Sequence, residues 1–176
     1  TNRVEEGFPL NYLWGYEVGG IHQTQEEVNA YLATTSDQQS DDTRRAPGDI
    51  FFEDKFGPAT EEGEFRSEGA DGVVNTLDQT FLGNTIPGFF YGLNLGANWR
   101  GFDVSVFFQG IGDVQKYNSI RRRGESMSGP GVNQWTTTNN RWTPTNPSTT
   151  FPRAMASDPT GNPRFSSRWI EAAGFM

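Results

Sequence analysis

The sequence predicts an all-β protein organised around one long hairpin, residues 88–110. Apolar and polar side chains alternate along this segment, with a break only at Arg100-Gly101. Strand side chains point alternately to the two faces of a sheet, so this period of two predicts two strands, each apolar on one face. Arg-Gly fits a tight turn with glycine at a position of positive φ. Pairing Trp99 with Phe102 then places the apolar residues of both strands on the same face.

The two faces of the hairpin bear on whether it lies in a membrane or in water. The pattern alone is compatible with a membrane β-barrel and with a soluble β-sheet. Each strand has about the 9–11 residues that a tilted strand needs to cross a bilayer. Aromatic side chains bracket the apolar row at both ends, as in outer-membrane barrels. In a barrel, the membrane-facing residues are Tyr91, Leu93, Leu95, Ala97, Trp99, Phe102, Val104, Val106 and Phe108. The lumen-facing residues are Asn94, Asn98, Asp103, Ser105 and Gln109.

Composition and charge narrow the class of protein. The 176 residues include 34% hydrophobic residues, 21 Gly and 10 Pro, which is a loop-rich composition. There is no run of about 18 apolar residues, so the sequence predicts no transmembrane helix. The sequence has no Cys, which excludes a disulfide scaffold and a cysteine metal site. The net charge is −8, with seventeen acids against five bases in residues 1–87, which argues against nucleic acid as a partner.

Ahead of the hairpin, the sequence predicts one short helix and one short strand. Thr24, with Glu27 three residues later, fits a capping box and predicts a helix that ends near Ala33. The polar, turn-like segment 34–48 is expected to be a mobile loop. Residues 50–54 are expected to form a short strand, and a long insertion, residues 57–69, follows it.

Residues 70–78 contain the one pattern that resembles a metal loop. Asp71-Gly72 followed by an apolar residue, with Asp78 seven positions after Asp71, matches the second half of an EF-hand-type calcium loop. The first half does not match, because its ligand positions would fall on Ser67 and Gly69, which are poor ligands. Asp71 and Asp78 are therefore weak metal candidates. An Asp-Gly turn is favoured over calcium, and no cofactor is expected.

The sequence predicts no catalytic site. The one His, His22, stands outside any Ser-His-Asp or multi-His pattern, and no carboxylate pair is typical of acid–base catalysis. The basic run 121–123 is expected to be solvated or paired with acids. Trp135, Trp142 and Trp169 could stack on sugars, but a long loop needs its own small core, so a core role is favoured. The protein is therefore expected not to be an enzyme.

A series of short motifs, in order along nearly the whole chain, carries a resemblance to a known family. The motifs are Gly7-Phe-Pro-Leu, Trp14-Gly-Tyr, Gly20-Ile-His-Gln, Pro47-Gly-Asp-Ile, Ala70-Asp-Gly-Val-Val-Asn, Leu82-Gly-Asn-Thr-Ile-Pro, Tyr91-Gly-Leu-Asn-Leu-Gly, Gly101-Phe-Asp-Val-Ser-Val-Phe-Phe-Gln-Gly, Asn140-Arg-Trp-Thr-Pro and Arg164-Phe-Ser-Ser-Arg-Trp-Ile-Glu171. Each motif is weak by itself, and their common order makes the signal specific. The chain resembles the C-terminal third of the SusC/RagA-like TonB-linked outer-membrane transporters of Bacteroidetes.

This resemblance implies that the chain is a fragment of an antiparallel transmembrane β-barrel of about 22 strands with long extracellular loops. Residues 88–110 would be the transmembrane hairpin, and residues 1–87 and 111–176 would be extracellular loop regions. The implied function is import of oligosaccharides or peptides across the outer membrane. The implied partners are outer-membrane lipid, a SusD-like lipoprotein that acts as a lid, and TonB, which would act through a plug region outside this sequence.

The chain also departs from the family pattern. The insertion 57–69 interrupts the family's Asp-rich loop, which puts metal binding there in doubt. The last barrel strands, which normally follow the Arg-Trp-Ile-Glu motif, are missing, and an isolated hairpin would have unpaired edges. Two other interpretations stay open. One is a soluble surface glycan-binding β module that uses the loop Trp residues, and the weaker one is a glycoside-acting enzyme.

Overall fold

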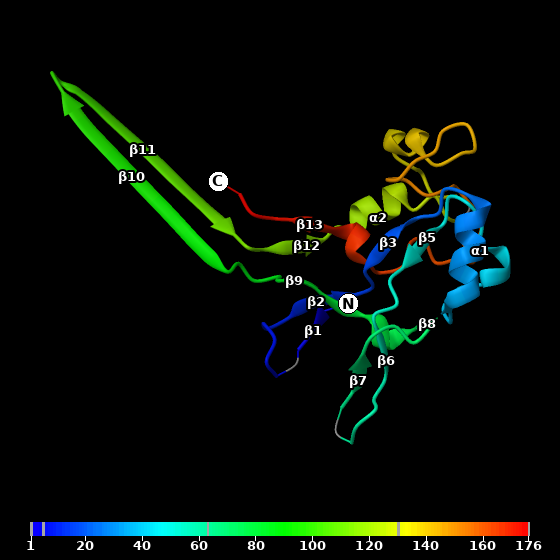
Figure 1. Cartoon of the computed structure of the whole chain (residues 1–176). Coiled ribbons are helices and arrows are strands. Elements are labelled where there is room, and N and C mark those ends of the chain that lie inside the picture. Colours follow the sequence, from blue (N-terminus) through cyan, green and yellow to red (C-terminus); the bar gives the residue numbers. More distant parts are fainter. Residues whose placement is uncertain (1, 5, 63, 130, 176) are drawn as a thin grey trace. The chain divides into compact units, whose positions relative to one another are not determined.

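The computed structural model describes residues 2–4, 6–62, 64–129 and 131–175. They form mostly short strands, with two α-helices and several 3-10 turns (Figure 1). The chain divides into two compact units, which are described separately. The first comprises Thr1–Trp14, Phe81–Tyr117 and Ile170–Met176, and the second comprises Gly15–Thr80 and Asn118–Trp169. In the described ranges, no helix combines the length and the apolar character needed to cross a membrane.

The first unit is built from strands. A three-stranded sheet has the order β1 (Asn2–Arg3), β2 (Tyr12–Gly15), β9 (Thr80–Gly83). The long hairpin consists of β10 (Phe89–Trp99) and β11 (Phe102–Gly112), and β12 (Gln115–Tyr117) pairs with β13 (Ile170–Ala172). Beyond β13, the chain runs antiparallel beside β11. There Ile111 and Phe175 each donate their N–H to the other's carbonyl, at 3.0 and 3.2 Å.

The long hairpin confirms the predicted turn and register. Trp99 pairs with Phe102, Leu95 with Val106, and the pairing continues unbroken to the open end. Arg100 has φ 48° and Gly101 has φ 86°, so both central residues have positive φ, as in a type I′ turn. This turn matches the right-handed twist of the strands and sets the register of every pair above it.

Aromatic rings lie over glycines at the open end of the hairpin. Phe89 pairs with Gly112 and Tyr91 with Gly110, and the two rings lie 6.2 Å apart. A Cβ atom at Gly110 would lie 2.4 Å from the Tyr91 ring, and one at Gly112 would lie 2.1 Å from the Phe89 ring. The glycines therefore let each ring lie flat on the partner strand, an arrangement that stabilises glycine-containing strands.

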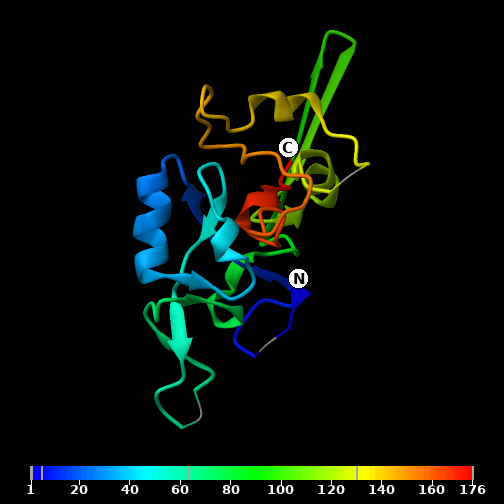
Figure 2. The same cartoon turned by 90° about the vertical axis from the view of Figure 1, so that its right-hand side faces the viewer.

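The second unit holds both helices, α1 (Gln25–Thr34) and α2 (Ser119–Glu125) (Figure 2). Its strands pair as antiparallel β3 (Val18–Ile21) with β5 (Ile50–Phe52), parallel β4 (Ser36–Asp37) with β8 (Val73–Val74), and antiparallel β6 (Phe56–Pro58) with β7 (Arg66–Glu68). Its 3-10 turns are η1 (Asp42–Arg44), η2 (Thr76–Asp78), η3 (Thr136–Asn140) and η4 (Ser167–Trp169). The core consists of Tyr16, Ile21, Ile50, Phe52 and Val74, with Val18 and Trp142 packed against it.

Helix α1 begins where the capping pattern predicts. Thr24 Oγ1 accepts the N–H of Glu27 at 3.2 Å, as an N-cap residue does. The Glu27 carboxylate accepts the N–H of Gln23 at 2.7 Å, one residue before the expected partner. Val28 is fully buried and anchors the helix to the unit.

Two sequence predictions about the loops are wrong. Residues 34–48 do not form a mobile loop, because β4 pairs with β8 and the side chains of Asp37 and Arg45 are buried. The chain also has a second short helix, α2, where no helix was expected. Its segment is nearly all polar and lacks an apolar period, but Asn118 caps it by accepting the N–H of Arg121 at 2.8 Å.

Candidate functional site

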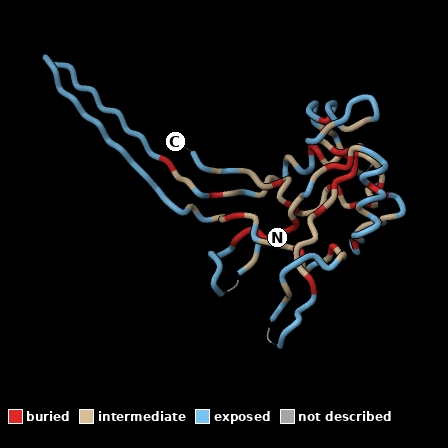
Figure 3. The backbone as a smooth tube through the Cα atoms, viewed as in Figure 1, coloured by how far each residue is buried: buried red, intermediate tan, exposed pale blue. Residues whose placement is uncertain are grey.

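The long hairpin is the main candidate site because its two faces differ in chemistry. One face carries the cross-strand pairs Leu95–Val106 and Ala97–Val104. Leu95 is 52% exposed and Val106 is 40% exposed, so the described residues of the first unit leave this face uncovered (Figure 3). Exposed apolar stripes of this length are typical of surfaces that contact a membrane or another protein.

The opposite face is polar for most of its length. Asn98 pairs with Asp103 and Gly96 with Ser105, so small and polar groups meet across the strands near the turn. All five residues predicted to face a lumen lie on this face. Phe107 and Phe90 interrupt its polar character, and both are more than 60% exposed, at 62% and 72%. Whether this face meets water in a barrel remains a prediction.

The turn end of the hairpin carries an aromatic pair and a cation. Trp99 and Phe102 are 67% and 71% exposed and sit opposite each other on the apolar face. The Arg100 guanidinium lies over the Trp99 ring, 5.0 Å from its centroid. Indole and guanidinium groups beside an apolar stripe are typical of the boundary between hydrocarbon and water.

The loop with the weak metal candidates is held by protein donors. Both oxygens of Asp78 are occupied: Oδ1 accepts the N–H groups of Lys55 and Phe56 at 2.8 and 3.0 Å, and Oδ2 accepts that of Asn75 at 2.8 Å. Asp71 Oδ1 accepts the N–H of Val73 at 2.9 Å, which forms the favoured Asp-Gly turn. Gly72 has φ 84°, as this turn requires. In the described ranges, no cluster of three or more His, Cys, Asp or Glu residues is placed to hold a metal ion.

The insertion 57–69 folds back onto the same loop. It forms the β6–β7 hairpin, and the Arg66 guanidinium of β7 donates to the carbonyls of Leu77 and Gln79. The same guanidinium lies over the Phe56 ring, 3.4 Å from its centroid. Arg66 thus ties the insertion to η2, and the Asp71–Asp78 loop is organised by the chain's own cation and backbone donors.

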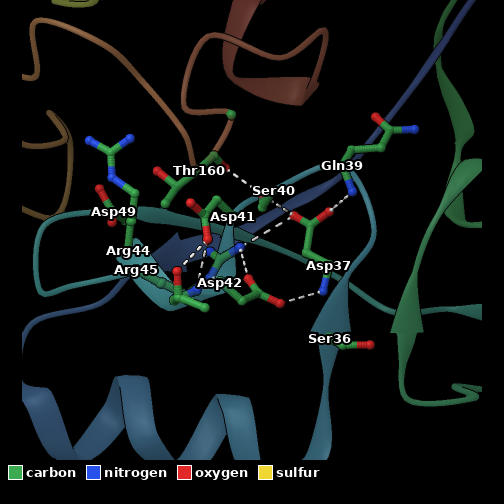
Figure 4. Close-up of polar contacts among 12 residues, drawn as sticks. Ser36, Asp37, Gln39, Ser40, Asp41, Asp42, Arg44, Arg45, Asp49 and Thr160 are labelled. Atoms are coloured by element: carbon green, nitrogen blue, oxygen red, sulfur yellow. Dashed lines mark hydrogen bonds and ion pairs between the residues drawn. The ribbon is translucent and has the colours of Figure 1, made fainter.

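A buried charge network holds the loops of the second unit together (Figure 4). Arg45 pairs with Asp37 at 3.3 Å and with Asp42 at 2.9 Å, and donates to the Ile50 carbonyl at 3.0 Å. Arg164, more than a hundred residues further along the chain, donates to Asp37 at 3.1 Å. The side chains of Asp37 and Arg45 are fully buried. Removing one partner of such a group leaves an uncompensated buried charge, which costs about 3–5 kcal/mol.

A second buried carboxylate, Asp49, joins the same loops. Arg153 donates to it through two nitrogens, at 2.7 and 2.8 Å, in a bidentate pair. Asn162 donates to Asp49 at 3.3 Å, while its own carbonyl oxygen accepts the N–H of Ile50 at 2.8 Å. These bonds join residues of the 45–50 segment to residues 153–164, which explains why a segment so polar in sequence is ordered.

His22 lies in an aromatic cluster and not in a catalytic arrangement. It is buried, stacks on Phe51 at 4.7 Å between ring centroids, and meets the edge of Tyr31 at 5.2 Å. Burial, with a smaller contribution from Arg45, lowers the pKa of His22 below its ordinary value of 6.5. Burial also raises the pKa of Tyr31 to about 12, so both rings are neutral at physiological pH.

The three Trp residues of the loops have different roles. Trp169 is buried, and its indole N–H donates to the carbonyl of Arg164 at 3.1 Å. Trp142 packs against the core. Trp135 is 42% exposed, so the core role that was favoured for all three holds for Trp142 and Trp169 only. A single sequence gives no signal that separates these cases, because the distinction depends on what packs against each ring.

Comparison with known proteins identifies relatives of the chain. No protein-family model matches it. TonB-dependent receptor P26 of Formosa agariphila is 30% identical over 108 residues, which are 61% of this chain and 11% of that protein. TonB-dependent receptor P3 of the same organism is 26% identical over 180 residues, which span 100% of this chain and 15% of that protein.

Solved structures share the fold. The RagAB peptide transporter superposes with a TM-score of 0.59 at 20% identity, over 96% of this chain and 15% of the matched chain. The RagAB peptide importer in its closed-closed state superposes with a TM-score of 0.57 at 17% identity, over 98% and 17%. The chain thus spans less than a fifth of each of these proteins. The predicted resemblance to SusC/RagA-like TonB-linked transporters is confirmed, and the relatives are named as receptors and transporters, not enzymes.

Proposed function

We propose that this chain is part of the barrel and outer loops of a TonB-dependent outer-membrane transporter, in which the β10–β11 hairpin crosses the bilayer. The observation that carries the proposal is the pair of eleven-residue strands, apolar on one face and mostly polar on the other, with both faces exposed. At about 3.3 Å per residue, eleven residues are long enough to cross the hydrocarbon layer when tilted.

The physical requirements of a bilayer fit this hairpin. Hydrogen bonds between β10 and β11 satisfy one side of each strand, and neighbouring strands of a closed barrel would satisfy the other side. Leu93, Leu95, Val104 and Val106 would then contact lipid, and Asn94, Asn98, Ser105 and Gln109 would line the lumen. The pairing of Ile111 with Phe175 supports this arrangement, because it already adds a third chain segment beside β11.

The cargo of the transporter would be oligosaccharides or peptides. Peptide transport is named for RagAB, whose fold the chain shares, and the sequence relatives are named only as TonB-dependent receptors. A SusD-like lipoprotein would act as a lid, and TonB would supply energy through a plug region. A soluble glycan-binding β module is the alternative. The exposed Trp135 favours glycan contact in either case, while the exposed apolar hairpin face favours the membrane.

The test uses the full-length protein expressed in an outer membrane. A folded barrel stays compact in sodium dodecyl sulfate until it is boiled, so its electrophoretic mobility changes on heating. We expect this heat-dependent shift, and we expect uptake of cargo to require TonB. Recovery of the protein in the soluble fraction, with no heat-dependent shift, would contradict the proposal and favour the soluble module.

A further inference from the structure

Helix α2 carries three consecutive arginines, of which only Arg121 forms an ion pair with a carboxylate of α2. Arg121 Nε donates to Glu125 at 2.9 Å, and Glu125 also accepts the hydroxyl of Thr137 at 3.1 Å. Glu125 is buried, and these two donors compensate its negative charge. Arg122 and Arg123 are exposed, and within the described residues neither has a carboxylate partner. This is unusual in a chain of net charge −8, where acids outnumber bases.

Arg122 and Arg123 line a cavity of about 350 Å³ together with three serines, Ser119, Ser126 and Ser128. Arg122 Nε donates to the carbonyl of Pro163 at 2.6 Å, which fixes the guanidinium at the wall and leaves its terminal nitrogens available. In the described part of the chain, no hydrogen bond occupies the three hydroxyls, and no carboxylate lines the cavity. Guanidinium and hydroxyl donors converging without an acid are the groups that bind oxyanions.

A second cavity, of about 300 Å³, adjoins the first, because Arg123 and Val132 line both. It also contains Trp135 and Asn133. The Trp135 ring lies against Gly124 of α2, where a Cβ atom would be 2.4 Å from the ring, and the backbone N–H of Trp135 donates to the Gly124 carbonyl at 2.8 Å. The indole thus packs against the helix backbone, and Trp135 as a whole stays 42% exposed, so that a flat apolar surface can stack on it.

We propose that these two cavities form one subsite for an acidic sugar residue. The C–H face of the sugar ring would stack on Trp135, and an oxyanion substituent would enter the cavity of Arg122, Arg123 and the three serines. A sulfate ester and a carboxylate share this chemistry. The proposal rests on the proposed transport function, and it selects anionic oligosaccharides as cargo. The net charge of the chain is −8, and the positive charge of Arg122 and Arg123 would attract anionic cargo to this one place.

The test measures binding to the purified full-length transporter with four probes: a sulfated oligosaccharide, its desulfated counterpart, a uronic-acid oligosaccharide and an acidic peptide. We expect one or both anionic sugars to bind at least about tenfold more tightly than the neutral one, with affinity that falls as salt rises. Arg123→Gln should remove this preference and leave the neutral sugar unaffected. Trp135→Phe should weaken both sugars and keep the preference.

Arg44→Gln is the matched control, because Arg44 is an exposed arginine of η1 in the same unit and lines neither cavity. Equal effects of Arg123→Gln and Arg44→Gln, equal affinity for charged and neutral sugars, or preference for the acidic peptide would each overturn the subsite. The heat-dependent shift of the same preparations reports on the barrel. An intact barrel without the preference refutes the subsite alone, and binding by protein that forms no barrel refutes the transporter alone.

Discussion

At the scale of single residues, buried polar groups determine how the loops of the second unit are held. Asp78 is the clearest case, since it is fully buried and accepts three backbone N–H groups. A buried donor that loses its acceptor costs about 1–3 kcal/mol, so one carboxylate here organises several residues of backbone. Asp71, seven positions earlier, is exposed and accepts one.

Asp78→Ala is therefore expected to lower local stability by about 3–5 kcal/mol, because three partly buried donors lose their buried acceptor. Asp71→Ala is the matched control and should cost less than about 1 kcal/mol, because it removes one exposed hydrogen bond. Hydrogen exchange at the amides of Lys55 and Phe56 measures both. Similar acceleration of exchange in the two variants would show that Asp78 does not hold the loop.

Calcium at physiological concentration is expected to leave the stability of the Asp71–Asp78 loop unchanged. Calcium takes six to eight oxygen ligands. The carboxylate oxygens of Asp78 and Asp54 already accept backbone N–H groups. The measurement is a titration of the full-length transporter with calcium and with a chelator, beside the Asp71→Ala/Asp78→Ala variant. A saturable stabilisation that the variant lacks would instead identify Asp71 and Asp78 as ligands.

His22 is expected to make the second unit less stable in mild acid. Its folded-state pKa lies below the ordinary value of 6.5, so the unfolded chain binds the proton more readily. The stabilisation is complete above about pH 6.5 and is lost as the pH falls below it. His22→Phe keeps the stack on Phe51 and should remove this pH dependence. Hydrogen exchange of the α1 amides at pH 5.5 and 7.5, corrected for intrinsic rates, measures the pH dependence of stability. The same pH dependence in the parent protein and in His22→Phe would refute the prediction.

At the scale of elements, the long hairpin shows how a local pattern can determine a whole structure. The alternation of side chains, the two-residue turn and the aromatic rings over Gly110 and Gly112 all require the same register. A shift by one residue would exchange the apolar and polar faces and would push the Tyr91 ring into a neighbour with a side chain. Three independent features of the sequence therefore specify the same register.

Val104→Arg and Ser105→Arg test the two faces of this hairpin. In the full-length barrel, Val104→Arg should cost about 1–3 kcal/mol, because it places a charge in the hydrocarbon layer between its boundary at Phe102 and its middle, where such a charge costs about 2–4 kcal/mol. Ser105→Arg, on the polar face, should cost much less. The yield of heat-modifiable barrel and its unfolding in denaturant measure both, and equal losses would contradict the two-faced interpretation.

At the scale of the whole molecule, the proposed topology predicts an orientation. Outer-membrane barrels have short periplasmic turns and long extracellular loops. The two-residue turn at Arg100-Gly101 should therefore face the periplasm, and residues 1–87 and 111–176 should lie mostly outside. Single-cysteine variants Arg100→Cys and Glu62→Cys can be treated on intact cells with an impermeant thiol reagent. We expect labelling at position 62 only, and labelling at position 100 would reverse the proposed topology.

The sequence by itself determined the features that depend on neighbours close in the chain. These are the hairpin with its turn and register, the start of α1, the Asp71-Gly72 turn and the family resemblance, since alternation, capping and turn chemistry act over a few residues. Only the tertiary structure decided the rest. The order of segment 34–48 depends on Arg164, which donates to Asp37, and on Arg153, which donates to the Arg44 carbonyl, both more than a hundred residues away. The two cavities beside α2 depend on Pro163 and Trp135. Such contacts leave no periodic trace in the sequence, because each is made by single side chains whose partners are selected by packing.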